Sequence, residues 1–395
     1  MNKTGSTLIY LECPLTGEKF EPDYPHRINP SNGKPLLAKY DYKIASKTLT
    51  KSNLSKRNPD LWRYREVLPI RDFSNIFSLG EGFTPLIKSN RLSSHLGLKN
   101  LWIKDESLNP TGSFKARGLA VAISRAYELG IRNITMPSAG NAAGAMAAYA
   151  AKAGMNANVF MPKDVPLANY MECKYYGANV ELIDGFINDC GRISSELAEK
   201  NDLFDISTMK EPYRVEGKKT MADEIVEQVG WSVPDVIIYP TGGGTGVVGI
   251  WKAMNEMQEL GLIGSERPKI ISVQAEGCSP IFNAFIKGKR FSEEFSNPNT
   301  LASGMRVPSA IGDFLVLDAV RGSGCKVMVV SDKSMIKSVE LLSQFEGIFS
   351  APEGGATLSA LQKLIITGEI SNDMNIVLMN TGTSLKYIEA VNAKN

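Results

Sequence analysis

From about residue 98 onward, the chain alternates short apolar segments with Gly-rich turns and helical patterns. The apolar segments are rich in β-branched residues and lie at 101–104, 134–136, 158–161, 179–183, 236–239, 270–273, 327–330 and 376–379. The helical patterns between them include 142–153, 216–229, 247–260, 334–344 and 356–366. Short segments of this kind are typical of strands buried on both faces. Because strand alternates with helix, we predict an α/β fold with parallel sheets and right-handed crossovers.

Charge and hydropathy exclude several classes of partner. The chain has 44 Lys and Arg against 42 Asp and Glu, and no long run of one sign. We therefore expect no nucleic-acid partner and no binding to an anionic membrane surface. No segment approaches the ~20 apolar residues of a membrane span, and the first residues do not lead into a signal peptide. These features predict a cytoplasmic protein.

The cysteines and histidines are too few and too dispersed for several common kinds of site. The five cysteines lack CxxC spacing, which argues against a disulfide framework and a closed zinc site. The two histidines, His26 and His95, both lie before residues 109–118, in regions with no catalytic pattern. Histidine-based triads and His-rich metal centres are thus disfavoured, and we predict no metal.

Lys115 lies in an unusual setting for a lysine. Residues 109–118 have the sequence Asn-Pro-Thr-Gly-Ser-Phe-Lys-Ala-Arg-Gly, which is typical of a turn and not of a charged surface. Most single lysines lie on solvated faces, but a lysine held by such a turn near a helix start loses part of its charge by desolvation. It is then a nucleophilic amine that can form a Schiff base with a carbonyl. Lys115 is our candidate catalytic residue.

A Gly-rich turn follows the predicted strand at 236–239. Residues 241–246 have the sequence Thr-Gly-Gly-Gly-Thr-Gly, so backbone N–H groups and the start of the next helix can surround a phosphate. Residues 244–249 also fit G-x-G-x-x-G, the dinucleotide fingerprint. Glu276, the acidic residue at the end of the next strand, comes later than the ~20 residues of that fingerprint. A phosphate cradle is the favoured interpretation, and a dinucleotide site is the alternative.

The lysine and glycine motifs belong to an ordered series that resembles a known family. The series is similar to the fold type II (tryptophan synthase β-like) pyridoxal-phosphate enzymes and, within them, to the threonine synthases. It covers about three quarters of the chain, and besides 113–118 its stretches are 80–86, 138–141, 212–220, 241–246, 303–308, 351–356 and 381–382.

The resemblance implies two lobes of parallel or mixed sheet, flanked by helices, with pyridoxal 5′-phosphate between them. The smaller lobe, residues 110–220, would carry Lys115. The larger lobe, residues 76–109 with 221–395, would carry the phosphate cradle. Residues 1–75 would form an N-terminal arm or small subdomain, with a degenerate, metal-free knuckle around Cys13. The resemblance also implies a homodimer.

The resemblance further implies a set of site residues. Lys115 would hold the cofactor and transfer protons, Asn141 would bond the cofactor 3′-oxygen, and Thr381 would meet its pyridine nitrogen. The implied cofactor residues are Lys115, Asn141, Gly242, Gly243, Gly244, Thr245, Gly246 and Thr381. The implied substrate residues are Thr84, Ser113, Ser138, Gly140, Arg214, Lys218 and Arg306, with Arg214 on the substrate phosphate; a solvated face would explain Lys218 equally well.

The implied activity is that of threonine synthase, a pyridoxal-phosphate-dependent carbon–oxygen lyase that forms L-threonine and phosphate from O-phospho-L-homoserine and water. The chain departs from the threonine-synthase pattern at Ala116, Ala142 and Met209. A threonine or serine ammonia-lyase, or another β-elimination or β-replacement enzyme, is therefore an alternative. A cofactor-binding sensor without turnover is a more remote one.

Overall fold

A mixed six-stranded sheet lies at the centre of the larger part of the molecule. The computed structural model describes residues 5–138, 140–185 and 187–392. The strand order is β12-β11-β10-β13-β5-β4, and all neighbours are parallel except β4 and β5. The strands are β4 (Leu86–Lys88), β5 (Asn100–Asp105), β10 (Val236–Pro240), β11 (Lys269–Ala275), β12 (Val327–Val330) and β13 (Asn375–Asn380).

Helices pack on this sheet from both sides, and the central strand β10 is buried along its whole length. The helices of this part are α3 (Arg91–His95), α8 (Arg214–Gln228), α9 (Thr245–Glu259), α10 (Pro280–Ile286), α11 (Asp313–Gly322), α12 (Asp332–Glu346), α13 (Pro352–Ile366) and α14 (Ile388–Asn392). The edge strand β4 begins at the last residue of the stretch 80–86 and was not predicted from sequence, because its three residues are too few for a pattern.

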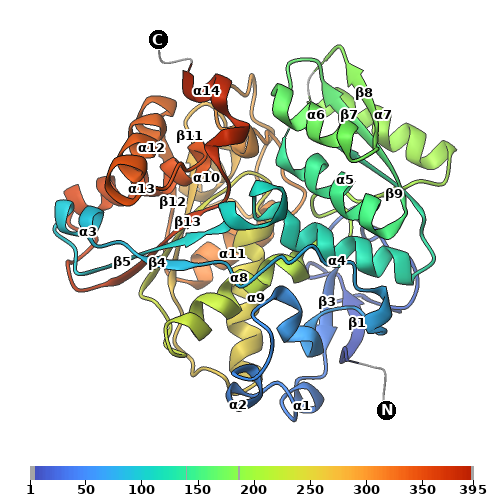
Figure 1. The fold of residues 1–395 in the computed structure, drawn as a ribbon, viewed down its shortest axis with the longest axis horizontal. Coiled ribbons are helices and arrows are strands. Elements are labelled where there is room, and N and C mark those ends of the chain that lie inside the picture. Colours follow the sequence, from blue (N-terminus) through green and yellow to red (C-terminus); the bar gives the residue numbers. More distant parts are fainter. Residues whose placement is uncertain (1–4, 139, 186, 393–395) are drawn as a thin grey trace.

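A second, fully parallel sheet forms the green part of Figure 1. Its strand order is β8-β7-β6-β9. The strands are β6 (Asn133–Pro137), β7 (Asn156–Pro162), β8 (Asn179–Ile183) and β9 (Phe204–Asp205), and the associated helices are α4 (Lys115–Glu128), α5 (Asn141–Ala153), α6 (Leu167–Tyr175) and α7 (Ile187–Lys200). The α/β prediction is confirmed.

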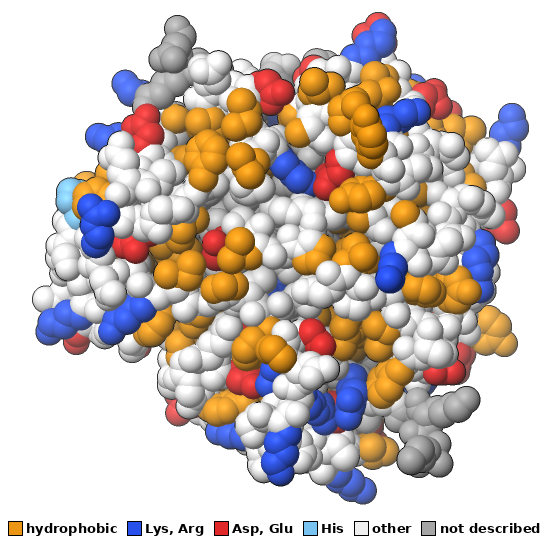
Figure 2. Space-filling model, viewed as in Figure 1, with side chains coloured by type: hydrophobic (Ala, Val, Ile, Leu, Met, Phe, Trp, Pro, Cys, Tyr) orange, Lys and Arg blue, Asp and Glu red, His pale blue; other side chains and the backbone are white. Residues whose placement is uncertain are grey.

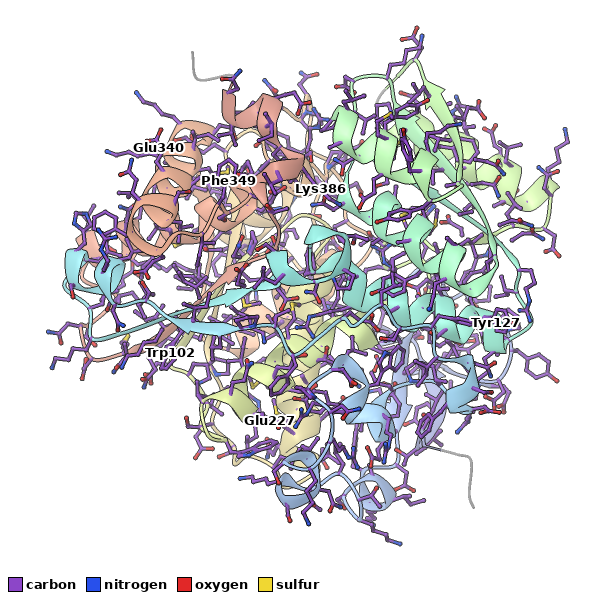
Figure 3. All side chains as sticks on the ribbon, in the orientation of Figure 1. Trp102, Tyr127, Glu227, Glu340, Phe349 and Lys386 are labelled. Atoms are coloured by element: carbon purple, nitrogen blue, oxygen red, sulfur yellow. The ribbon has the colours of Figure 1, made fainter. Side chains whose placement is uncertain are left out.

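The N-terminal residues fold into a small antiparallel sheet with strand order β2-β1-β3. Its strands are β1 (Leu8–Glu12), β2 (Lys19–Phe20) and β3 (Leu37–Tyr40), followed by α1 (Tyr42–Ala45), α2 (Lys51–Leu54) and short 3₁₀ turns at Leu61–Val67 and Phe73–Asn75. This segment lies against α8: the Tyr40 hydroxyl donates to Glu216, and the Tyr64 hydroxyl donates to Glu227 at 2.6 Å. Figure 3 shows Glu227 where α8 meets the blue N-terminal segment.

Glycines allow α4, α8 and α9 to pack at very short distances. A Cβ atom at Gly217 of α8 would lie 2.0 Å from the carbonyl oxygen of Arg117 on α4. A Cβ atom at Gly249 of α9 would lie 2.9 Å from the backbone nitrogen of Lys219 on α8. Since neither position has room for a side chain, the sequence brings the N-terminal ends of these three helices together.

Basic and acidic side chains are interspersed over the face shown in Figure 2, which agrees with the lack of a long run of one sign in the sequence. In the described ranges, no helix is long and apolar enough to cross a membrane. Nor do three or more potential metal-ligating side chains gather there into a group that could hold a metal ion.

Candidate active site

A cleft between the six-stranded and four-stranded sheets contains all eight predicted cofactor residues. Lys115 begins α4, Asn141 begins α5, Gly242–Gly246 connect β10 to α9, and Thr381 follows β13; all of them line this cleft. They come from the carboxyl ends of parallel strands and from the helices that follow, which is where α/β proteins usually bind ligands. The structure therefore brings together residues that are up to 266 positions apart in the sequence.

The turn before α4 is fixed by contacts with the segment after β13. Ser113 forms an isolated β-bridge with Gly382, and the Phe114 N–H donates to the Thr381 carbonyl oxygen at 3.0 Å. Thr111 has a φ of 62°, an uncommon value for a non-glycine residue, so the turn is sharp. These contacts place Lys115 at the first position of α4, with its Nζ 4.3 Å from the centre of the Phe114 ring.

The Lys115 amine is less basic than an ordinary lysine. Burial and the positive charge of Arg214 lower its pKa to about 8, while Glu353 acts in the opposite direction. A substantial fraction of the amine is thus neutral near physiological pH. A neutral amine is the form that attacks carbonyl groups and accepts protons.

We expect the reactivity of Lys115 in the cofactor-free protein to be half-maximal near pH 8. Because its pKa lies below the usual lysine value of about 10.5, the reactive neutral form should already be abundant at pH 9. Competitive labelling with acetic anhydride, followed by peptide mass analysis, measures this directly. The exposed residue Lys200, labelled in the same sample, gives the pH dependence of an ordinary lysine. A Lys115 profile that still rises above pH 10 would contradict the argument.

The glycine turn forms a cradle that has no room for side chains. A Cβ atom at Gly242 would lie 2.2 Å from the Gly304 carbonyl oxygen, and one at Gly246 would lie 2.0 Å from the Tyr239 hydroxyl. Gly244 has a φ of +80°, in the left-handed region that favours glycine. Since α9 begins directly afterwards at Thr245, its N-terminal end adds positive potential. The residues present fit a bound phosphate.

Arg214, the first residue of α8, is a buried cation with free donors. Its Nη1 donates to the Ile206 carbonyl oxygen at 2.9 Å. Its Nε and Nη2 are buried and have no hydrogen-bond partner among the described residues. Burial lowers the pKa of Arg214, and Glu211 opposes this shift. Because unpaired buried donors are costly, they indicate a place for an anionic group of a ligand.

A hydrogen-bonded chain that the sequence analysis missed fixes Asn141. The Asn141 amide donates to the Tyr387 hydroxyl at 3.1 Å, and that hydroxyl donates to Glu353 Oε1 at 3.0 Å. The Gly304 N–H donates to the same oxygen at 2.8 Å. Burial raises the pKa of the Glu353 carboxyl. Glu353 belongs to the stretch 351–356 that the resemblance highlighted, whereas no sequence signal indicated Tyr387.

Asn141 Oδ1 and the Ser113 hydroxyl are buried and unpaired among the described residues. Ser138 and Gly140 lie at the start of α5, where the Ser138 hydroxyl donates to the Gly140 carbonyl oxygen and accepts from the Ala143 N–H. Ala139, the remaining member of that motif, lies outside the described residues.

None of the seven predicted substrate residues is among the residues that line the Lys115 cleft, and two of them belong to other sites. The Thr84 hydroxyl donates to Glu106 at 2.6 Å and accepts from Arg117 at 3.1 Å, so it belongs to a buried ionic network. Arg306 lines a neighbouring, more open pocket, where it lies 4.0 Å from Asp164. Sequence position alone could not separate these sites, because both residues lie in stretches that resemble the family.

Comparison with known proteins defines the class. Residues 77–382 match the family of pyridoxal-phosphate dependent enzymes, and the chain belongs to this family. The threonine synthase of Methanocaldococcus jannaschii is 37% identical over 352 residues, which cover 89% of this chain and 86% of that protein. The threonine synthase of Halalkalibacterium halodurans is 34% identical, and the match covers 82% of this chain and 89% of that protein.

Solved structures support the same fold. Maize serine racemase has a TM-score of 0.66 at 24% identity, with 76% of this chain and 87% of that chain covered. Threonine deaminase isoform 2 from Solanum lycopersicum has a TM-score of 0.66 at 22% identity, and the match covers 78% of this chain and 83% of that chain. At these identities the likeness shows the fold alone. The predicted fold type II architecture, cofactor and enzyme class are confirmed.

Proposed function

We propose that this chain catalyses the threonine synthase reaction, the conversion of O-phospho-L-homoserine and water to L-threonine and phosphate. Its curated relatives in archaea and bacteria, at 32–37% identity, carry that name. The observation that carries the proposal is a pair of anion-binding features beside one weakly basic amine. The glycine cradle suits the cofactor phosphate, and the unpaired donors of Arg214 suit the phosphate of the substrate.

The residues of the cleft have distinct proposed roles. When bound, pyridoxal phosphate supplies an electron sink that acidifies C–H bonds near the substrate amino group. Lys115 Nζ would hold the cofactor and then accept and return protons, as a pKa of about 8 permits. Asn141, fixed through Tyr387, would orient the cofactor ring, and Thr381 would meet its nitrogen. Ser113, Ser138 and Gly140 would bind the substrate carboxylate region.

The Arg214 guanidinium would bind the leaving phosphate with its free Nε and Nη2 donors. A guanidinium offers two parallel donors, which match a phosphate better than one ammonium does. Because Arg214 also lowers the pKa of Lys115, a phosphate that neutralises its charge would raise the basicity of the amine. Substrate binding would thereby make Lys115 a stronger proton acceptor.

Phosphate release tests the activity. The purified protein is supplied with O-phospho-L-homoserine, and phosphate and threonine are measured in the same samples. We expect the two products in equal amounts. Release of ammonia from threonine or serine, with no phosphate from phosphohomoserine, would contradict the proposal and favour an ammonia-lyase.

We also propose the organisation that the resemblance implies. The two sheets support a smaller lobe at 110–220 and a larger lobe at 76–109 with 221–395. A homodimer is proposed from the family resemblance alone. A cytoplasmic location is proposed from the amino-acid sequence and from the biosynthetic reaction.

A further inference from the structure

Lys218 is a fully buried lysine without an acidic partner. Its Nζ lies 3.2 Å from Thr245 Oγ1 and 4.6 Å from the centre of the Phe114 ring. In the part of the chain that the structure describes, no carboxylate forms an ion pair with it. The adjacent Lys219 differs, because its Nζ lies 2.6 Å from both Glu216 and Glu256. Burial and the nearby charges of Lys115 and Arg214 lower the pKa of Lys218, and a ligand that supplies negative charge would restore its charged form.

The position of Lys218 on α8 separates it from Arg214. The two residues are four positions apart, so they share one face of the helix and are offset by about 6 Å along its axis. Arg214 contacts Ile206, next to β9 of the four-stranded sheet. Lys218 contacts Thr245, at the start of α9 after β10 of the six-stranded sheet. The two cations therefore contact different segments of the protein, and one phosphate need not satisfy both.

Thr245 connects Lys218 to the glycine cradle. Its hydroxyl accepts from the Lys218 ammonium, which has donors only. The hydroxyl proton of Thr245 is consequently available to donate in another direction. Thr245 lines the cleft together with Gly242–Gly246. A phosphate in the cradle would receive this hydrogen bond, and the ammonium behind it would strengthen the bond.

We propose that Lys218 is a positioning residue for the cofactor phosphate, acting through Thr245, and that Arg214 alone serves the substrate phosphate. This inference rests on the cofactor site of the proposed function. The family resemblance implies that Lys218 binds the substrate. We assign it instead to the cofactor, where it would favour the phosphorylated form over pyridoxal.

The test compares pyridoxal phosphate with pyridoxal, which lacks the phosphate, as ligands of the cofactor-free protein. Both react with Lys115, and absorbance titration gives their dissociation constants. We expect Lys218→Gln to weaken binding of pyridoxal phosphate by about 10- to 100-fold, the range for loss of a charge-assisted hydrogen bond. Binding of pyridoxal should change by less than about 3-fold, which also shows that the variant is folded.

Two further variants sharpen the test. Thr245→Val should cause a similar loss, and adding Lys218→Gln to it should have little further effect, because the two residues act as one unit. Lys219→Met removes the adjacent buried lysine; it should lower stability but leave the preference for pyridoxal phosphate over pyridoxal unchanged.

The proposal would be overturned by either of two results. One is an equal loss of both ligands in Lys218→Gln. The other is unchanged binding of pyridoxal phosphate together with weaker binding of O-phosphohomoserine, which would return Lys218 to the substrate. Because the titration needs no turnover, it remains decisive even if phosphohomoserine is not the substrate.

Discussion

Replacement of Lys115 by alanine is expected to lower turnover by at least about 10³-fold. Proton transfer by a positioned side chain alone contributes roughly 10²- to 10⁴-fold, and the variant also loses the covalent attachment of the cofactor. Lys218, whose amine also lies near the Phe114 ring, is not expected to replace Lys115, since it lies on another helix and donates to Thr245. The initial rate of phosphate release from O-phosphohomoserine measures the effect.

The same variant should also lose the visible absorption that borohydride removes from the native protein. Lys200→Ala, at an exposed position of α7, is the matched control and should retain both rate and colour. Retention of a borohydride-sensitive band in Lys115→Ala would show that another lysine holds the cofactor. The assignment of the catalytic amine would then be wrong.

Glu224→Gln is expected to destabilise the fold by about 3–5 kcal/mol, the usual result of removing one member of a buried ionic group. Glu224 accepts from Lys104 Nζ at 2.7 Å and from Arg117 Nη2 at 2.6 Å, and all three side chains are fully buried. Its other oxygen accepts from the Phe83 N–H at 2.7 Å. The amide would leave two buried cations with one fewer negative charge.

Urea denaturation monitored by circular dichroism measures this loss. Glu196→Gln is a suitable control, because its ion pair with Arg192 is exposed on α7 and such pairs contribute about 0–1 kcal/mol. If Glu224→Gln lowers the free energy of unfolding no more than the control variant does, the predicted contribution of the buried ionic group is wrong. It would mean that Glu106, the other carboxylate on Arg117, compensates for the missing charge.

The sequence predicted regular elements well where apolar periodicity was strong. The segment 179–183 coincides with β8, and the pattern at 142–153 begins one residue after the start of α5. The N-terminal sheet was not predicted as strands. Its short strands alternate with polar turns, and their pairing depends on contacts with α8 that no local pattern encodes.

Only those residues of the candidate site that belong to local sequence motifs could be predicted. Lys115 and the glycine cradle have distinctive local chemistry, and the structure brings them into one cleft. Glu353 and Tyr387 come together with Asn141 only in three dimensions. Thr84 shows the converse limit: it lies in a family-like stretch, yet its hydroxyl is already bonded within a buried ionic network. Motif spacing cannot show which way a side chain points.

The contact between the N-terminal sheet and α8 has a consequence for modularity. One hydrophobic cluster includes Leu11 of the N-terminal sheet, Leu119 of α4 and Ile225 of α8, and the Lys219 ammonium donates to the Val67 carbonyl oxygen at 2.6 Å. The family match begins only at residue 77. The match to the Methanocaldococcus jannaschii protein covers 89% of the chain and therefore extends before residue 77. That boundary thus marks neither the start of recognisable similarity nor the start of an independently folding unit. Exchange of the first 76 residues between relatives would have to preserve the partners of Glu216 and Glu227, or the helix that carries Arg214 and Lys218 would lose its support.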